Sequence, residues 1–119
     1  MFVESKKEGE VIAMPSIAPL EPWRRWLLNG ADILERQGLA KCTEYDKVTG
    51  AVCFIGAVFW ADQGRPSAST GDMFGASVAR HAAYDKMKDF LGRCPIAWNN
   101  AAETTQNEVV SAMRACARQ

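Results

Sequence analysis

Three side chains have the types and the order that a cysteine-dependent hydrolase would need. Cys53, His81 and Asn99 follow one another in the order Cys, His, Asn. The cysteine would supply a thiolate nucleophile, the histidine a base, and the asparagine a group that orients the base. Cys53 also stands at the predicted start of a helix, where the helix dipole lowers a thiol pKa. These residues are the candidate catalytic set.

The surroundings of Cys53 favour a structural role instead. Val52, Phe54 and Ile55 place apolar side chains around it. The C-G-[SA]-C-[WY] context of papain-like hydrolases is missing. Cys53 and His81 also fall on predicted helices that are close in sequence, rather than on separate subdomains. We therefore interpret Cys53 as a small buried hydrophobic residue, expect no catalysis, and keep the hydrolase as the alternative.

The cysteine and histidine content predicts neither a metal nor a cofactor. The chain has four cysteines and one histidine. No two cysteines form a C-x-x-C pair, which structural zinc sites of the finger type need. We expect reduced thiols and therefore a cytoplasmic protein, because the N-terminus has no apolar segment typical of a signal peptide.

Two short groups are the candidate binding residues. The first opens a predicted helix with two tryptophans on one face, and the second precedes the last helix. Together they comprise Trp23, Arg24, Arg25, Trp26, Trp98, Asn99 and Asn100. Each group also has a structural interpretation. Tryptophan side chains commonly lie in the core or half-buried against it, and exposed arginines are solvated. The asparagines can form a turn that leads into the last helix.

The overall charge limits the partners that the chain can have. Its 119 residues suit one domain, and 48% of them are hydrophobic. Fourteen basic residues balance fourteen acidic ones, which argues against broad binding to nucleic acid or to an anionic membrane. Zero net charge favours self-association, so a homo-oligomer is possible. A nucleic-acid-binding accessory protein that uses Arg24 and Arg25 is the weaker alternative.

The longest apolar run, from Ala51 to Ala61, is predicted to be the centre of the fold. Lys41–Asp46 and Gly50–Cys53 are predicted to form a short antiparallel hairpin. A helix then begins after Cys53 and is apolar on most sides, which is typical of a buried helix. Gly56 lies inside this helix, where glycine is unfavourable, so we expect another backbone segment to approach it closely.

Three further helices are predicted around this run, over residues 22–37, 73–91 and 106–117. Pro22 and Gly38 bound the first of them. Ala83, Met87 and Phe90 are on the predicted buried side of the second. Thr105 and Glu108 form a capping box at the start of the third. Residues 93–97 are predicted to be an extended connector.

The fold class is therefore mainly α (α+β), with about four helices, one short hairpin and a single domain over residues 22–119. Residues 1–21 are predicted to be an extended or disordered arm, because closely spaced prolines interrupt them. The apolar faces predict a shared core formed by Leu34, Phe54, Val58, Met87 and Met113.

An ordered set of motifs also resembles a known family. It consists of Cys53-x-x-Gly56-Ala57, then Trp98-Asn99-Asn100, then Thr105-x-x-Glu108 with the terminal helix. The set is similar to a small family of uncharacterised proteins from bacteria, notably actinobacteria, and their phages. Ala102-Glu103-Thr104 replaces that family's usual Pro-Gly-Arg. The resemblance implies a link to phages or mobile elements, and it provides no catalytic residue that could be carried over to this chain.

Taken together, these observations predict a small cytoplasmic module that binds another protein or regulates it. An inhibitor of a host system is one example of such a module. No part of the chain is predicted to cross a membrane, because the central apolar run is too short.

Overall fold

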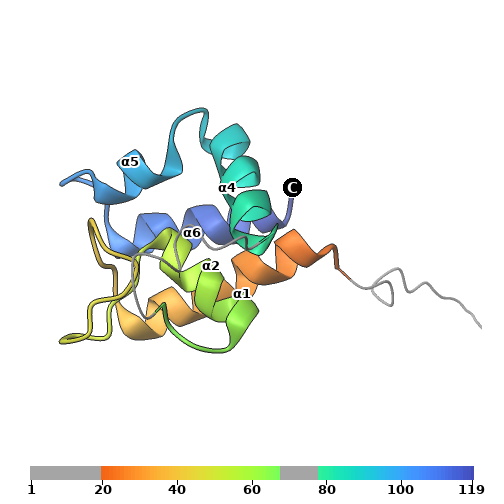
Figure 1. The fold of residues 1–119 in the computed structure, drawn as a ribbon. Coiled ribbons are helices and arrows are strands. Elements are labelled where there is room, and N and C mark those ends of the chain that lie inside the picture. The colour runs from red at the N-terminus through yellow and green to blue at the C-terminus, as the bar shows by residue number, and fades with distance from the viewer. Residues whose placement is uncertain (1–19, 68–77) are drawn as a thin grey trace, which may run out of the picture.

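The computed structural model describes residues 20–67 and 78–119, which form five helices (Figure 1). The helices are α1 (Pro22–Gln37), α2 (Phe54–Gln63), α4 (Val78–Leu91), α5 (Pro95–Asn100) and α6 (Gln106–Ala117). No β-strand occurs within these two segments. The mainly α prediction is thereby confirmed as an all-α fold, with five helices rather than about four in the described residues.

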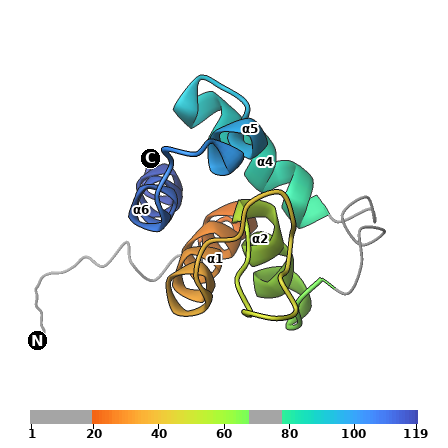
Figure 2. The same cartoon turned by 90° about the vertical axis from the view of Figure 1, so that its left-hand side faces the viewer.

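Helix α1 lies at the centre of the bundle. Pro22 occupies its first turn, where a missing N–H is harmless. Gly38 follows its last residue with a φ of 93°, so the predicted bounds of 22–37 are confirmed. Figure 2 shows α1 between α6 and α2, with α4 and α5 beyond them. Leu27, Ala31 and Leu34 are fully buried on its inner face.

Helix α2 is buried on most sides, as its sequence predicts. Every residue from Phe54 to Phe59 is buried. A Cβ atom built on Gly56 would lie only 2.0 Å from the main-chain oxygen of Glu44. The predicted close approach of another backbone segment is therefore present, and it explains why this helix carries a glycine.

The core joins four of the five helices through apolar side chains. Five large members, which the sequence analysis placed on inner faces, have no exposed surface: Leu34, Phe54, Val58, Met87 and Met113. The cluster also includes Val109 and Val110 from α6. Helix α6 begins at the predicted capping box, in which the Glu108 N–H donates to Thr105 Oγ1 and the Thr105 N–H donates to Glu108 Oε1.

The predicted hairpin is wrong. Only two isolated bridges pair this segment, Leu39 with Val52 in parallel and Tyr45 with Val52 in antiparallel orientation. Cys42 adopts a left-handed φ of 65°, which interrupts an extended strand. The Cys42 N–H donates to the Asn100 side chain at 2.8 Å. The antiparallel register of Tyr45 and Val52 would also place Cys42 opposite Ile55, which already lies in α2, so no second strand faces Cys42.

The tip of the same loop is held by one carboxylate. Asp46 Oδ1 accepts hydrogen bonds from the N–H groups of Val48 and Thr49 at 2.9 and 3.2 Å. These two bonds hold the pKa of Asp46 below its ordinary value. The turn that the sequence predicts between the two extended pieces is therefore present, although no strands flank it.

Two other predictions need a boundary correction. Residues 93–97 do not form an extended connector, because Pro95 begins α5 and fits the first turn of a helix. Helix α4 ends at Leu91, as predicted, whereas residues 73–77 of the predicted helix lie outside the described residues. Most of the predicted arm, residues 1–19, lies outside them too.

Within the described part of the chain, no helix has the length and the apolar character needed to cross a bilayer.

Candidate functional site

The first candidate site is the start of α2, where Cys53 is the N-cap residue. Its Sγ accepts a hydrogen bond from the Gly56 N–H at 3.4 Å. Burial raises the pKa of the Cys53 thiol to about 11, although the N–H groups of Gly56 and Ile55 act in the opposite direction. The cost of burying a thiolate thus exceeds the effect of the helix terminus. Near neutral pH the thiol is protonated and acts as a cap.

Asn99 lies beside this helix start and is 1% exposed. Its Oδ1 accepts from the Phe54 N–H at 3.0 Å, and its Nδ2 donates to the Ala40 main-chain oxygen at 3.1 Å. Nδ2 also donates to Asn100 Oδ1 at 3.1 Å. The side chain therefore joins α5 to α2 and to the loop that precedes it, and its polar atoms are occupied by these bonds.

His81 does not complete the catalytic set. It is exposed in the first turns of α4, and no hydrogen bond between described residues links it to Cys53 or to Asn99. The structure brings Cys53 and Asn99 to the same helix terminus without the base. The described residues also contain no group of three or more His, Cys, Asp or Glu side chains that is arranged to hold a metal ion.

The segment around Trp98 joins α5 to the loop between α1 and α2. Trp98 is half-buried and packs against the core. The Lys41 ammonium donates to the main-chain oxygens of Ala101 and Thr104, the latter at 2.8 Å. Sequence reasoning missed Lys41, because its partners are backbone oxygens 60 and 63 residues further along the chain. The second candidate binding group is thus largely a structural clamp.

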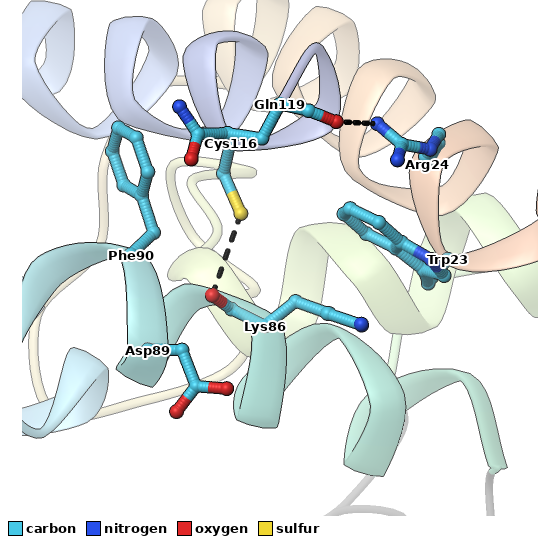
Figure 3. A pocket seen from close by; sticks show the side chains of 7 residues that line it. All are labelled: Trp23, Arg24, Lys86, Asp89, Phe90, Cys116 and Gln119. Carbon is cyan, nitrogen blue, oxygen red and sulfur yellow. Dashed lines mark hydrogen bonds between the residues drawn. The ribbon is translucent and has the colours of Figure 1, made fainter.

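The second candidate site is a cleft between the start of α1, α4 and the end of α6 (Figure 3). Its volume is about 290 Å³. The cleft is lined by charged, aromatic and thiol side chains from three helices and the C-terminal residue: Trp23, Arg24, Lys86, Asp89, Phe90, Cys116 and Gln119. Two of the predicted binding residues, Trp23 and Arg24, therefore take part in a concave surface.

A cation–indole cluster forms one wall of this cleft. The Arg24 guanidinium carbon lies 4.4 Å from the centroid of the Trp23 ring, and Lys86 Nζ lies 4.9 Å from it. Both distances are within the range of a cation–π contact. Arg24 is also fixed in place, since its Nη1 donates to the main-chain oxygens of Ala117 and Gln119 at 2.8 and 2.6 Å.

Glu21 completes the fixation of Arg24. The Arg24 Nε donates to the Glu21 carboxylate at 3.0 Å. This bond, together with the nearby Trp23 indole, lowers the pKa of Glu21 below its ordinary value. The start of α1 is therefore tied to the end of α6 by a single arginine.

Cys116 closes the inner side of the cleft. It is buried, and its Sγ lies 3.5 Å from the Lys86 main-chain oxygen, to which it donates. Burial raises the pKa of the Cys116 thiol. The sulfur is thus a packing element between α6 and α4.

Arg25 and Trp26 do not line the cleft. Arg25 is exposed and donates to the Leu20 main-chain oxygen at 2.7 Å, while Trp26 is half-buried against the core. Sequence reasoning missed Lys86 as a site residue and placed Phe90 on the buried side of its helix. The ring of Phe90 is 36% exposed at the cleft. The sequence indicated this face only through the helical spacing of apolar residues in α4. That spacing does not distinguish a fully buried face from a partly exposed one.

Comparison with known proteins yields one match. No curated protein and no solved structure matches the chain significantly. A family model described as a family of unknown function matches residues 19–119, which include both candidate sites. The chain therefore belongs to this family of unknown function, DUF6197.

Proposed function

We propose that this protein is a small non-catalytic binding module that contacts another protein through the cleft between α1, α4 and α6. The observation that carries the proposal is the Trp23 ring held between Arg24 and Lys86, with the exposed side chain of Phe90 across the cleft from it. Tryptophan and arginine are the residue types that dominate binding energy at protein interfaces. A fixed aromatic side chain at the edge of a concave surface is well suited to that role.

The alternative of a cysteine-dependent hydrolase receives less support. A nucleophilic cysteine needs an available thiolate and a neighbouring base. Cys53 is a helix cap whose pKa is raised by burial, and His81 makes no hydrogen bond to it among the described residues. These facts favour a structural role for the candidate catalytic set.

A nucleic-acid-binding role also receives less support. Backbone recognition needs a track of several cations. The cleft is lined by two cations, Arg24 and Lys86, which do not form such a track.

The proposed wider setting of the module is based mainly on the sequence. The resemblance to proteins of bacteria and their phages favours a regulator of a host system. The four cysteines are free, which agrees with a reducing cytoplasm. Zero net charge favours self-association, so we include a second copy of the chain among the proposed partners.

Affinity purification from a bacterial lysate tests the proposal with matched variants. Lys86→Glu reverses a charge in the cleft, and Lys47→Glu makes the same change in the exposed loop tip. We expect a protein that co-purifies with the wild type and with Lys47→Glu but is depleted by Lys86→Glu and by Trp23→Ala, as judged by quantitative mass spectrometry. Equal recovery with all four proteins would show that the cleft is not the contact surface.

A further inference from the structure

Two cations at the cleft retain hydrogen-bond donors that the fold does not use. Lys86 Nζ lies over the Trp23 ring and makes no hydrogen bond or ion pair with any residue in the described segments. Arg24 uses Nε and Nη1 in the bonds already described. Its Nη2 makes none within those same segments. Both groups can therefore accept a carboxylate as a new partner.

Two carboxylates, those of Glu21 and Asp89, lie near these two cations. Glu21 is already paired with Arg24. Asp89 lines the cleft, but Figure 3 shows its carboxylate pointing away from Trp23 while the Lys86 ammonium points toward it. The unused donors of Lys86 and Arg24 are therefore the groups that a carboxylate of a partner can meet beside the indole.

The size and walls of the cleft indicate a side chain rather than a larger ligand. Its volume of about 290 Å³ is at or below the lower end of small-molecule sites, which span roughly 300–1,000 Å³. The Trp23 indole and the partly exposed Phe90 ring provide apolar contact. One apolar side chain can enter, with charged neighbours left at the rim.

We propose that the occupant is an acidic peptide segment of a partner protein. One apolar side chain of that segment packs between Trp23 and Phe90, and flanking carboxylates pair with Lys86 and with the free donor of Arg24. This inference rests on the proposed function and specifies the partner's chemistry. A nucleic-acid strand fits less well, because the two cations that line the cleft are fewer than the track that a continuous phosphate chain needs.

A direct binding experiment with defined probes tests this inference. The full-length chain is titrated into three fluorescein-labelled probes: a short peptide of glutamates around a central leucine, the same peptide with lysines, and a single-stranded oligothymidine. Fluorescence anisotropy at low salt reports binding. We expect the acidic peptide to bind most tightly and to lose affinity as salt rises.

The variants locate the contact. Lys86→Glu is expected to weaken acidic-peptide binding by roughly tenfold or more, with Lys86→Ala intermediate, while Lys47→Glu stays within about twofold of the wild type. Both lysines are exposed, and thermal unfolding checks that the variants remain folded.

Three results would overturn the inference. They are equal or tighter binding of the lysine peptide, preference for the oligothymidine, and equal losses with Lys86→Glu and Lys47→Glu. If the acidic peptide fails while a lysate protein still depends on Lys86, the cleft is the contact surface but the partner's chemistry is different. If that protein is also unaffected by Lys86→Glu, the proposed function fails as well.

Discussion

Asn99 is a buried polar side chain that connects parts of the chain far apart in sequence. It bonds the Phe54 N–H at the start of α2 and the Ala40 main-chain oxygen in the preceding loop. The sequence analysis recognised the Trp98-Asn99-Asn100 segment as a structural anchor and as a binding candidate. It could not identify the bonded groups, because they lie 45 and 59 residues away and no local pattern encodes such a distance.

Replacing Asn99 tests its structural role. Asn99→Ala leaves two buried backbone groups without partners, so we expect a loss of about 2–6 kcal/mol in the free energy of unfolding, at roughly 1–3 kcal/mol for each unsatisfied group. Urea denaturation measures this loss. Asn107→Ala is the control, because Asn107 is exposed on α6 and its loss should remain within about 0.5 kcal/mol. Equal effects would contradict the clamp.

The raised pKa of Cys53 predicts a pH dependence of stability. The ordinary thiol value is 9.0, and the folded value is about 11. Below pH 9 the thiol is protonated in both the folded and the unfolded chain, so its contribution to the free energy of unfolding is fully present. As pH rises from about 9 to 11 the unfolded chain loses this proton first, and the free energy of unfolding falls by up to about 2–3 kcal/mol.

The matched protein for this measurement is Cys53→Ser. Serine retains an N-cap oxygen but does not titrate in this range, whereas all other ionisable groups are unchanged. Urea unfolding at several pH values should therefore show a steeper fall for the wild type than for Cys53→Ser. Parallel curves would mean that the thiol is not desolvated.

At the level of elements, a helix is predictable where its apolar periodicity begins or ends at a residue that caps or terminates helices. Pro22 and Gly38 bound α1, and the Thr105–Glu108 capping box begins α6, each as predicted. The hairpin was wrong because Cys42 has a left-handed φ of 65° and because α2 begins directly after Cys53, which leaves little extended chain on either side. Helix α5 was missed because its six residues are too few for a periodic pattern, and Pro95 was taken for a connector residue.

The close approach at Gly56 gives an element-scale prediction. In an unhindered helix, alanine would stabilise by about 1 kcal/mol relative to glycine. Here its Cβ would lie 2.0 Å from the Glu44 main-chain oxygen, so the loop or α2 must move. We expect Gly56→Ala to destabilise the protein by about 2 kcal/mol or more, measured by urea denaturation.

Gly64→Ala is the comparison for this substitution. Gly64 directly follows α2 as its C-cap residue. A Cβ atom built on Gly64 would have no other atom within 4 Å, but the residue has a left-handed φ of +76°. Alanine there should cost only about 1–2 kcal/mol, from backbone strain alone. If Gly56→Ala is the milder of the two changes, the backbone contact is not as tight as described.

At the scale of the whole molecule, the core and the cleft differ in how far the sequence predicts them. The five predicted core residues are fully buried, because each lies on the apolar stripe of its own helix. The cleft depends on how three helices meet: Trp23, Lys86 and Cys116 come from α1, α4 and α6. No single helix carries the pattern, so Lys86 and Cys116 gave no signal of a shared surface.

Deleting residues 1–18 tests the extent of the domain. The family match begins at residue 19, and every described core residue lies between Leu27 and Ala117. We expect the shortened protein to keep cooperative urea unfolding, with a free energy within about 1 kcal/mol of the full chain. Leu34→Ala, by comparison, should lose about 2–5 kcal/mol through a core cavity. Loss of cooperativity on deletion would place the N-terminal residues in the core.

Cys53 caps α2 and its thiol pKa is raised by burial, so we expect an unreactive thiol near neutral pH, as the proposed non-catalytic role requires. Alkylation by iodoacetamide at about pH 7 tests it most directly, because reactivity follows thiolate fraction and exposure. A pKa of about 11 leaves roughly a hundredfold less thiolate than the ordinary value of 9.0. Mass spectrometry then identifies the labelled cysteine.

The four cysteines provide the internal comparison. Cys42 and Cys94 are exposed. The pKa of Cys94 is lowered mainly by a hydrogen bond from the Ala97 N–H and, to a smaller extent, by the Tyr84 hydroxyl. We predict that Cys94 and Cys42 react first and that Cys53 reacts more slowly than a free thiol. Selective fast labelling of Cys53 that is lost in His81→Ala would contradict the account and favour the hydrolase.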